Sequence, residues 1–487
     1  MSTTEARATG PAPGGRPHPR TSTYLWLVGL VVMLSGLLFG YDQGVISGAL
    51  NGIEKDFSVG TFLLEVITSW VTLGAMVGAL AAGAVADRVG RRRTILLAAL
   101  LFVAGSLIEA LAPDAYVLVV GRVVIGLGVG VASVAAPLYA AEMAPARLRG
   151  RMVSLYQLAI TLGIFVAYFV DYLLTHSDNW RVMLGISAIP GLLLLFVMFP
   201  LKDSPRWYMK MRRRSDAEVA LAKVEPDADV ADELDRMRDA LDHEAAQNTS
   251  WGEVFAARWR RPLVIGVTLA VLQQLTGINA IIYYADKIFA AAGFLSPASQ
   301  SLATLWAIGA VNVVATLVAV AWVDHFGRKP LLMTGSVGMF ISLVVVGAMF
   351  LKMKHGVSAT DTVGPGMVTL VALVVFIASF AFSLGPVVWT IINEIYPAQV
   401  RGKGVAVATA ANWFAAWLVS QFFLSLVSLI SETGVFWLFA FFCLVTYWFV
   451  HRFVPETKGR SLEQLQAMWG DEDALAAAVG SYRSSTP

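Results

Sequence analysis

The chain has 487 residues, of which 57% are hydrophobic and only 14% are charged, and its mean hydropathy is +0.67. Soluble globular proteins carry about 25% charged residues, so this composition excludes an ordinary soluble domain. The net charge of +2 gives no reason to expect a nucleic-acid partner, and a single cysteine, Cys443, excludes a disulfide framework.

Residues 1–22 are rich in proline, glycine and arginine and contain no apolar stretch followed by a small-residue cleavage site. They predict a disordered cytoplasmic tail, and the first apolar run is expected to be an uncleaved membrane span.

Twelve apolar runs follow, and each is long enough for a helix to cross a bilayer, which takes roughly 20 residues. The runs lie at residues 24–50, 62–86, 93–112, 115–140, 151–174, 180–200, 261–290, 299–323, 330–351, 367–396, 403–430 and 434–454. The sequence therefore predicts an all-α membrane protein with twelve transmembrane helices.

Basic residues gather in every second interval between these runs. The intervals after spans two, four, six, eight and ten contain DRVGRRR, ARLRGR, a long segment of mixed charge, FGRK and RGK, whereas the alternate intervals are nearly free of lysine and arginine. Because basic loops stay on the cytoplasmic side, both termini are expected to be cytoplasmic.

Residues 202–260 form the one sizeable polar stretch, with apolar residues at helical spacing among mixed charges. This pattern predicts short amphipathic helices on the cytoplasmic face, acting either as a plain linker or as part of a gate. The predicted organisation is a six-helix half at 23–201, this linker, a second half at 261–455 and a cytoplasmic tail at 456–487.

Two cytoplasmic signatures occur twice. DRVGRRR at 87–93 corresponds to DHFGRK at 324–329, and EMAPARLRG at 142–150 corresponds to EIYPAQVRG at 394–402. This duplication indicates two parallel six-helix halves, the arrangement of major facilitator transporters, whose binding site lies between the halves near mid-membrane.

The repeated signatures carry opposite charges that can hold the halves together on the cytoplasmic side and separate when that side opens. The alternative is that they are ordinary interfacial charges, each pair worth under about 1 kcal/mol. The duplicated spacing favours the latch. Its predicted residues are Asp87, Arg88, Arg91, Glu142, Arg149, Asp324, Arg328, Glu394 and Arg401.

Over nearly its whole length the sequence resembles the sugar porter family of the major facilitator superfamily. The motifs that carry the resemblance are GYDQGVISGAL, DRVGRRR, GRVVIGLGVG, PLYAAEMAPARLRG, DSPRW, QQLTGINAIIYYA, DHFGRKPL, GPVVWTIINEIYPAQVRGKG and PETKGRSLEQ. The resemblance adds an expected pairing of Asp203 with Arg206 to the latch and a gating role for the linker. Lys202-Asp203 departs from the family's usual Pro-Glu, so the acid is one methylene shorter.

Polar residues inside membrane spans are costly and therefore mark functional sites. On the seventh run, Gln273, Gln274 and Asn279 do not fall on one line of an ideal helix, so the sequence predicts either a wide polar face or a helix broken near Gly277. Primary amides both donate and accept hydrogen bonds, which suits an uncharged, polyhydroxylated ligand better than an anion.

Other spans contribute the amides of Gln157, Asn312 and Asn412, together with aromatic rings that can pack against the C–H faces of a sugar. Hydrogen bonding between helices, unconnected with a ligand, is the alternative for any single amide. The predicted substrate-binding residues are Gln157, Gln273, Gln274, Asn279, Tyr283, Asn312, Trp389, Asn412, Trp413 and Phe39. The resemblance strengthens this assignment, most for Gln157, Gln273, Gln274, Asn279 and Trp389.

Asp42 on the first span and Arg122 on the fourth are charges inside the membrane. The resemblance implies a proton-coupling pair, because proton-coupled members of the family have a carboxylate and an arginine here. If their separation changes during transport, so does the affinity of Asp42 for a proton. The alternative is a static buried pair.

Taken together, these features predict a secondary active transporter that imports a monosaccharide or cyclic polyol by proton symport through alternating access. A proton-independent uniporter and, less favoured, a transporter-like sugar sensor remain open. Without a GxxxxGK[ST] stretch or clustered histidines, cysteines or acids, no ATP-driven pump, catalytic residue, metal or cofactor is expected. The predicted partners are the sugar, the proton and the bilayer of the cell membrane, and the resemblance implies a monomer.

Overall fold

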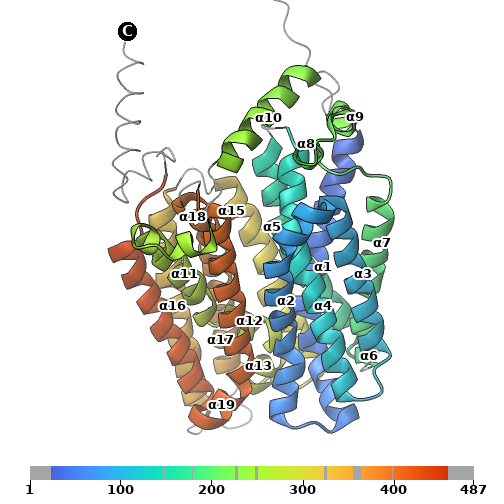
Figure 1. The fold of residues 1–487 in the computed structure, drawn as a ribbon. Coiled ribbons are helices and arrows are strands. Elements are labelled where there is room, and N and C mark those ends of the chain that lie inside the picture. The colour runs from blue at the N-terminus through green and yellow to red at the C-terminus, as the bar shows by residue number, and fades with distance from the viewer. Residues whose placement is uncertain are drawn as a thin grey trace, which may run out of the picture.

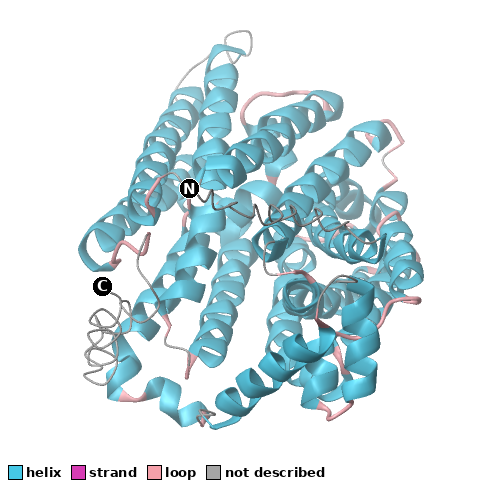
Figure 2. Cartoon of the chain, turned by 90° about the horizontal axis from the view of Figure 1, so that it is seen from above, coloured by secondary structure: helices cyan, strands magenta, loops and turns pink. Residues whose placement is uncertain are grey.

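The computed structural model describes residues 23–145, 148–177, 179–224, 229–246, 250–322, 326–354, 363–396 and 399–458. Within these ranges the chain is helical with short connections and contains no strand, as the view from above shows (Figure 2). The predicted tail at 1–22 and most of the tail at 456–487 lie outside the described residues.

The first half of the molecule is coloured blue to green in Figure 1. Its helices are α1 Thr23–Phe57, α2 Thr61–Val89, α3 Arg91–Ala110, α4 Ala115–Met143, α5 Arg149–Leu174, α6 Trp180–Gly185 and α7 Ala188–Met198. Helix α1 packs against α5, and α2 packs against α4.

Glycines allow the backbones of α1 and α5 to approach closely. A Cβ atom on Gly40 would lie 1.8 Å from the carbonyl oxygen of Ile160, and one on Gly163 would lie 2.3 Å from that of Leu37. Small residues serve this purpose in membrane bundles, where close packing replaces the hydrophobic effect as the attraction between helices.

The second half is coloured yellow to red in Figure 1 and contains more interruptions. Its helices are α11 Arg260–Leu275, α12 Ile278–Tyr283, α13 Ala285–Ala291, α14 Pro297–Ala303, the π-helix η4 Thr304–Ala310, α15 Val311–Trp322, α16 Arg328–Lys354, α17 Val363–Phe382, α18 Leu384–Ile395 and α19 Arg401–Phe453. Cys443 on α19 is fully buried in the core of this half.

Eleven stretches of the described chain are helical, long and apolar enough to cross a membrane. The last, α19, has 53 residues and contains Ser431 at φ 68° and ψ 165°, which is not helical backbone, so two spans meet there. The twelve predicted spans are thereby confirmed.

The two halves repeat the same packing. In the second half α11 packs against α19 and α15 against α17, as α1 packs against α5 and α2 against α4 in the first. Helix α2 meets α19 between the halves, and α5 meets η4 and α15. This pairing is what a six-plus-six duplication requires.

Short helices join the halves, as predicted. They are α8 Pro205–Lys210, α9 Arg214–Val224, α10 Val230–Ala246, η2 Trp251–Phe255 and η3 Ala257–Trp259. The start of α8 is fixed by Ser204, whose Oγ accepts a hydrogen bond from the Trp207 N–H at 3.1 Å, with Pro205 as the first helical residue.

Helices α8 to α10 lie over one end of the bundle (Figure 1), which we call the helical end. The loop between α1 and α2 marks the opposite end. Helices begin or end near the predicted domain boundaries at 23, 201, 261 and 455, but these boundaries stay predictions.

Candidate functional site

The seventh span is broken at Gly277. Helix α11 ends at Leu275, α12 begins at Ile278, and Gly277 between them has φ +87°, a left-handed conformation that glycine adopts without strain. Of the two alternatives that the sequence left open, the structure shows the break.

This break brings the three amides of the span together. The Asn279 amide donates to Gln274 Oε1 at 2.9 Å, and the Gln274 amide lies 3.4 Å from Gln273 Oε1. Asn412 on α19 closes the group, because its amide donates to Gln273 Oε1 and to the Ala270 carbonyl, both at 2.8 Å. We call these four side chains the amide cluster.

All four members of the amide cluster are buried, and within the described ranges no arginine or lysine hydrogen-bonds to them. Gln273 also donates to the carbonyl of Leu384 at 2.7 Å, at the break between α17 and α18. The cluster is therefore a neutral, hydrogen-bonding surface built at two helix interruptions.

Aromatic rings stand on both sides of the boundary between the halves. Phe39 on α1 and Trp413 on α19 are in contact, with ring centroids 5.6 Å apart and planes at 48°. Tyr283 is buried, and its hydroxyl lies 3.5 Å from Nε2 of Gln43 on α1. Trp389 on α18 is half-buried.

The two remaining predicted amides come from helices that meet between the halves. Gln157 lies half-buried on α5 and Asn312 buried on α15. Neither hydrogen-bonds to the amide cluster in the described part of the chain, so the structure does not join them to it.

Asp42 and Arg122 form an ion pair in the interior of the first half. Arg122 Nη1 lies 2.6 Å from Asp42 Oδ1, and its Nε donates to the Ile67 carbonyl on α2 at 3.1 Å. Arg122 is fully buried and Asp42 is 3% exposed. A charge-assisted contact of this length is strong because water cannot screen it.

A third charged side chain, which the sequence analysis missed, lies next to this pair. Glu109, near the end of α3, places Oε1 3.6 Å from Arg122 Nη1 and is 1% exposed. Neither of its carboxyl oxygens has a hydrogen-bond partner in the described residues. One guanidinium thus faces two buried carboxyls. The rule that singled out Asp42 would also have found this acid in the apolar run at 93–112.

The helical end of the first half holds a compact charge network. Arg91 contacts Glu142 through two nitrogens, at 2.8 Å and 2.9 Å, and lies 3.2 Å from Asp87. The Ser204 hydroxyl also donates to Oε2 of Glu142. Arg88 is exposed, and Arg149 donates weakly to the Ala144 carbonyl at 3.4 Å.

Asp203 does not have the partner that the resemblance implied. Its carboxylate accepts hydrogen bonds from the backbone N–H groups of Arg91 and Arg92, at 2.7 Å and 3.3 Å, at the start of α3. Arg206 is exposed. The free N–H groups and dipole of a helix N-terminus attract a carboxylate, and this replaces the expected side-chain pair. Burial raises the pKa of Asp203, and these N–H groups oppose the rise.

The second half repeats this arrangement with a residue that the sequence analysis did not assign. Glu456 accepts hydrogen bonds from the backbone N–H groups of Arg328 and Lys329, at 3.0 Å and 3.1 Å, at the start of α16. It belongs to the PETKGR repeat, which was the available signal. Arg328 lies 3.6 Å from Glu394.

Two further residues of the second half, Asp324 and Arg401, were predicted to belong to the latch. Asp324 lies outside the described residues. Arg401 donates to the Tyr396 carbonyl at 3.1 Å, within its own half. The described latch contacts therefore each lie inside one half, and clasping across the halves stays a prediction.

Contacts between the halves occur toward the opposite end of the bundle. Glu65 on α2 accepts from the backbone N–H and the hydroxyl of Ser425 on α19, at 2.6 Å and 2.7 Å. Ser69 donates to Gln421 at 2.8 Å, and Lys287 pairs with Glu54 at 2.6 Å. We call this set of contacts the seam.

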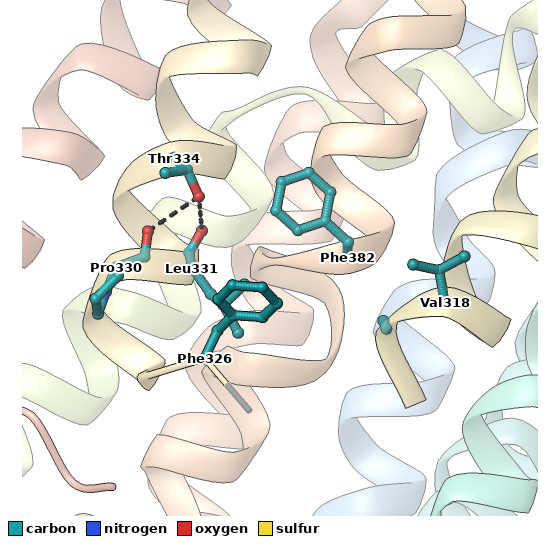
Figure 3. Close-up of a pocket in the computed structure, with 7 residues that line it drawn as sticks. Val318, Phe326, Pro330, Leu331, Thr334 and Phe382 are labelled. Carbon is teal, nitrogen blue, oxygen red and sulfur yellow. Dashed lines mark hydrogen bonds between the residues drawn. The ribbon is translucent and has the colours of Figure 1, made fainter. Parts of the chain in front are cut away.

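An apolar cavity of about 280 Å³ lies elsewhere, between α15, α16 and α17 (Figure 3). Val318, Ala319, Phe326, Pro330, Leu331, Thr334 and Phe382 line it. The Thr334 hydroxyl is bonded to the carbonyls of Pro330 and Leu331 within its own helix. This cavity therefore offers a sugar no free polar partner and is not the predicted site.

Two related six-helix halves with buried polar groups between them define a multi-pass membrane transporter of the major facilitator type. A family model described as "Sugar (and other) transporter" matches residues 28–469. The chain belongs to this family.

Proteins with similar sequences include two symporters of Escherichia coli strain K12. The galactose-proton symporter is 40% identical over 448 residues, covering 91% of this chain and 93% of the relative. The arabinose-proton symporter is 37% identical over 445 residues, covering 90% and 92%.

Solved structures of the Escherichia coli xylose transporter XylE share the fold. Its partially occluded inward-open conformation aligns with a TM-score of 0.78 and 32% identity, covering 90% of this chain and all of that one. The form bound to 6-bromo-6-deoxy-D-glucose aligns with a TM-score of 0.75 and 33% identity, covering 92% and 99%.

Proposed function

We propose that this protein imports a monosaccharide or cyclic polyol together with a proton, as a monomer in the cell membrane with both termini in the cytoplasm. The observation that carries the proposal is the buried Asp42–Arg122 pair, together with a buried amide cluster that carries no charge. The relatives named for proton symport of galactose and arabinose support the same reading.

The amide cluster suits a ligand with adjacent hydroxyls. Each hydroxyl both donates and accepts, as each primary amide does, so Gln273, Gln274, Asn279 and Asn412 can exchange their mutual hydrogen bonds for bonds to a sugar. Phe39, Trp413, Tyr283 and Trp389 offer flat apolar surfaces nearby. Gln157 and Asn312 complete the proposed site from the helices that border the other half.

Asp42 supplies the coupling. Its carboxylate is paired with Arg122 in this conformation, and the guanidinium offsets part of the cost of burying a negative charge. A rearrangement that lengthens the contact leaves the buried charge uncompensated and favours protonation. Protons entering the cell then release about 2.3 kcal/mol per 100 mV of membrane potential and about 1.4 kcal/mol per pH unit.

The contacts between the halves indicate the conformational state. The seam ties the halves together at the opposite end, while the described latch pairs lie within single halves. With the helical end in the cytoplasm, as the basic loops predict, this is an inward-facing arrangement. Alternating access would break the seam and bring the latch residues of the two halves together.

Proton movement tests the proposal directly. A transported sugar added to de-energised cells that express the protein should make the medium more alkaline, and galactose, arabinose, xylose, glucose and myo-inositol form the first panel. A sugar acid serves as the control, because its anion does not suit the neutral amide cluster. Sugar uptake without any proton movement would contradict proton symport and indicate a proton-independent uniporter.

A further inference from the structure

Two acidic side chains lie buried at the boundary between the halves, apart from the Asp42–Arg122 pair. Asp171 belongs to α5 of the first half and is 2% exposed, and Asp286 belongs to α13 of the second half and is 4% exposed. Neither was singled out by the sequence analysis, and the proposed transport mechanism gives neither of them a role.

Asp171 lies against the backbone of α1. Its Oδ2 accepts a hydrogen bond from the Gly48 N–H at 3.2 Å, and a Cβ atom on Gly48 would lie 2.4 Å from its Cγ. Its Oδ1 is buried without a hydrogen-bond partner in the described residues. One backbone N–H is too little to stabilise a buried carboxylate.

Asp286 approaches the same turn of α1 from the other half. Its backbone N–H donates to the Ser47 hydroxyl at 3.0 Å, and its carboxyl accepts from Ser301 at 2.9 Å and Thr304 at 2.5 Å. The consecutive residues Ser47 and Gly48 therefore contact the backbone of Asp286 and the carboxyl of Asp171, which places the two acids on one turn of α1, where their charges interact unfavourably.

Hydroxyl groups connect the backbone of Asp171 with the carboxyl of Asp286 across the boundary. The Thr175 hydroxyl on α5 donates to the Asp171 carbonyl at 2.7 Å and lies 3.2 Å from Ser301, which bonds Asp286. Thr175 follows α5 of the first half and Ser301 lies on α14 of the second half. Separation of the two halves would therefore break this chain of contacts.

Among the described residues, no basic group neutralises either carboxyl. In the described part of the chain, neither Asp171 nor Asp286 forms an ion pair with a lysine, arginine or histidine. The Glu54–Lys287 pair and His176 are at the exposed margin.

The titratable groups that face the two acids are phenols. Tyr41 on α1 faces Asp171, and Tyr168 on α5 faces both acids. Tyr283 on α12 stands next to Tyr168. The hydroxyl groups of Tyr41 and Tyr168 donate hydrogen bonds to the carbonyls of Met183 and Ile282, at 2.8 Å and 2.9 Å respectively.

We propose that Asp171 and Asp286 form a second proton-binding site, which holds at least one proton while the halves are closed here and releases it when they separate. Two carboxylates that are buried at the same turn of α1, without an ion-pair partner in the described residues, are too costly for both to remain charged. Separation admits water and allows both to ionise. The proposal rests on the alternating-access cycle proposed above, in which this end faces the exterior.

The sign of the pH dependence follows. Because the closed state binds more protons than the open state, acid on this side favours closure and alkali favours opening. If the closed state binds one proton more than the open state, the ratio of closed to open molecules changes up to tenfold per pH unit. This holds at pH values between the pKa of the site in the open state and its pKa in the closed state.

Hydrogen exchange measures this opening without relying on transport. The full-length protein in lipid nanodiscs, without sugar, is compared between pH 5.5 and 8.5, and rates in residues 163–174 and 284–291 are corrected for the intrinsic pH effect. The wild type should lose protection in both segments as the pH rises. The D171N/D286N variant should no longer lose protection as the pH rises.

Three controls separate the outcomes. E54Q removes an exposed acid of the same seam and should keep the wild-type response. D42N removes the proton linkage of the coupling pair but should still lose protection as the pH rises, so a failure of the proton-symport proposal, seen as uphill uptake in D42N, is distinguishable from a failure here. Replacing sodium with choline should change nothing.

A wild-type pH response in D171N/D286N, or protection that depends on sodium, would overturn the proposal. If the double variant does not fold, the single variants D171N and D286N decide the question. Each should flatten the pH response at least in part, and an unchanged response in both would overturn the proposal equally.

Discussion

At the scale of single residues, the buried polar groups of this bundle differ in how completely their charges and hydrogen bonds are balanced. Asp42 forms an ion pair with Arg122, and the side chains of the amide cluster hydrogen-bond to one another. Glu109 and Asp171 have oxygens without a hydrogen-bond partner in the described residues. A buried carboxyl of that kind is costly as an anion, so it is a place where proton binding and conformation are linked.

Replacing Asp42 by asparagine should abolish accumulation while leaving sugar exchange. The neutral amide keeps the size of the side chain but cannot change protonation, so sugar can still cross without a proton to drive it. Uphill uptake and equilibrium exchange of the same labelled sugar, measured in proteoliposomes, provide the check. Undiminished uphill uptake would remove Asp42 from the coupling role.

Replacing Asn279 by alanine should weaken sugar binding about tenfold, because one buried hydrogen bond to a neutral ligand is worth about 1–1.5 kcal/mol. The concentration for half-maximal uptake measures the effect. Asn393→Ala is the matched control, since that exposed amide donates only to the Trp389 carbonyl in its own helix. Equal effects of the two substitutions would contradict a ligand role for Asn279.

The sequence revealed those charges and amides that stand in the middle of apolar runs or in repeated motifs. Asp42, Arg122 and Gln273 were found in this way. Asp171 and Asp286 were missed because each lies near the end of an apolar run, where a charge is usually solvated. Only the staggering of neighbouring helices buries these acids, and stagger is a tertiary property.

At the scale of helices, the interruptions of the second half create the candidate site. The break at Gly277 turns Asn279 toward Gln274, and the break before Leu384 leaves a carbonyl for Gln273. An uninterrupted seventh helix would separate these amides around its circumference. Helix continuity, and not residue type alone, decides where the polar surface forms.

Gly277→Ala should therefore destabilise the protein. Its φ of +87° is strained for alanine, and the new Cβ would lie 2.3 Å from the ring of Phe439. A strained backbone position of this kind costs of order 1–3 kcal/mol, before the clash is added. The melting temperature measured in detergent should fall.

Gly402→Ala is the control for this substitution. A Cβ atom at Gly402, in the first turn of α19, meets nothing within 4 Å. Its melting temperature should stay constant or rise slightly, because alanine restricts the unfolded chain more than glycine does. Two equally stable variants would show that the left-handed conformation at Gly277 is dispensable.

The two helix breaks also show which local features can be read from a sequence. Gly277 was recognisable because three amides around it could not share one face of an ideal helix. Ser431 was not, since nothing in its sequence context demands a left-handed serine, and only the return of the chain across the membrane places a turn there. Its position between the eleventh and twelfth apolar runs was nevertheless predicted.

At the scale of the whole molecule, the two halves are bound by contacts whose chemistry differs between the ends. The seam uses Glu65, Ser69 and Lys287 across the boundary, whereas the charged motifs at the helical end pair within each half. The duplicated sequence predicted both halves and the charged motifs. It could not predict the seam, because its residues are not repeated.

Glu65→Ala should shift the molecule toward opening at the seam. The substitution removes both hydrogen bonds from Ser425 to Glu65, which at about 0.5–1.5 kcal/mol each contribute about 1–3 kcal/mol. The outward-facing fraction should rise roughly 5- to 100-fold, and the external sugar concentration for half-saturation should fall accordingly. Sugar binding to right-side-out vesicles is the measurement.

Glu54→Ala is the matched control. Its ion pair with Lys287 is partly exposed, so its loss should change the external affinity only slightly. An equal change in both variants would show that the buried carboxylate of Glu65 has no special part in holding the halves together.

The burial of Cys443 has a practical consequence. It is the only sulfhydryl of the chain and is enclosed in the second half, so reagents dissolved in water do not reach it while the protein is folded. Spin labels or fluorophores can therefore be attached to cysteines introduced on either half without first removing the native one. The rocking of the two halves becomes measurable, as a distance between two dyes, in an otherwise unaltered molecule.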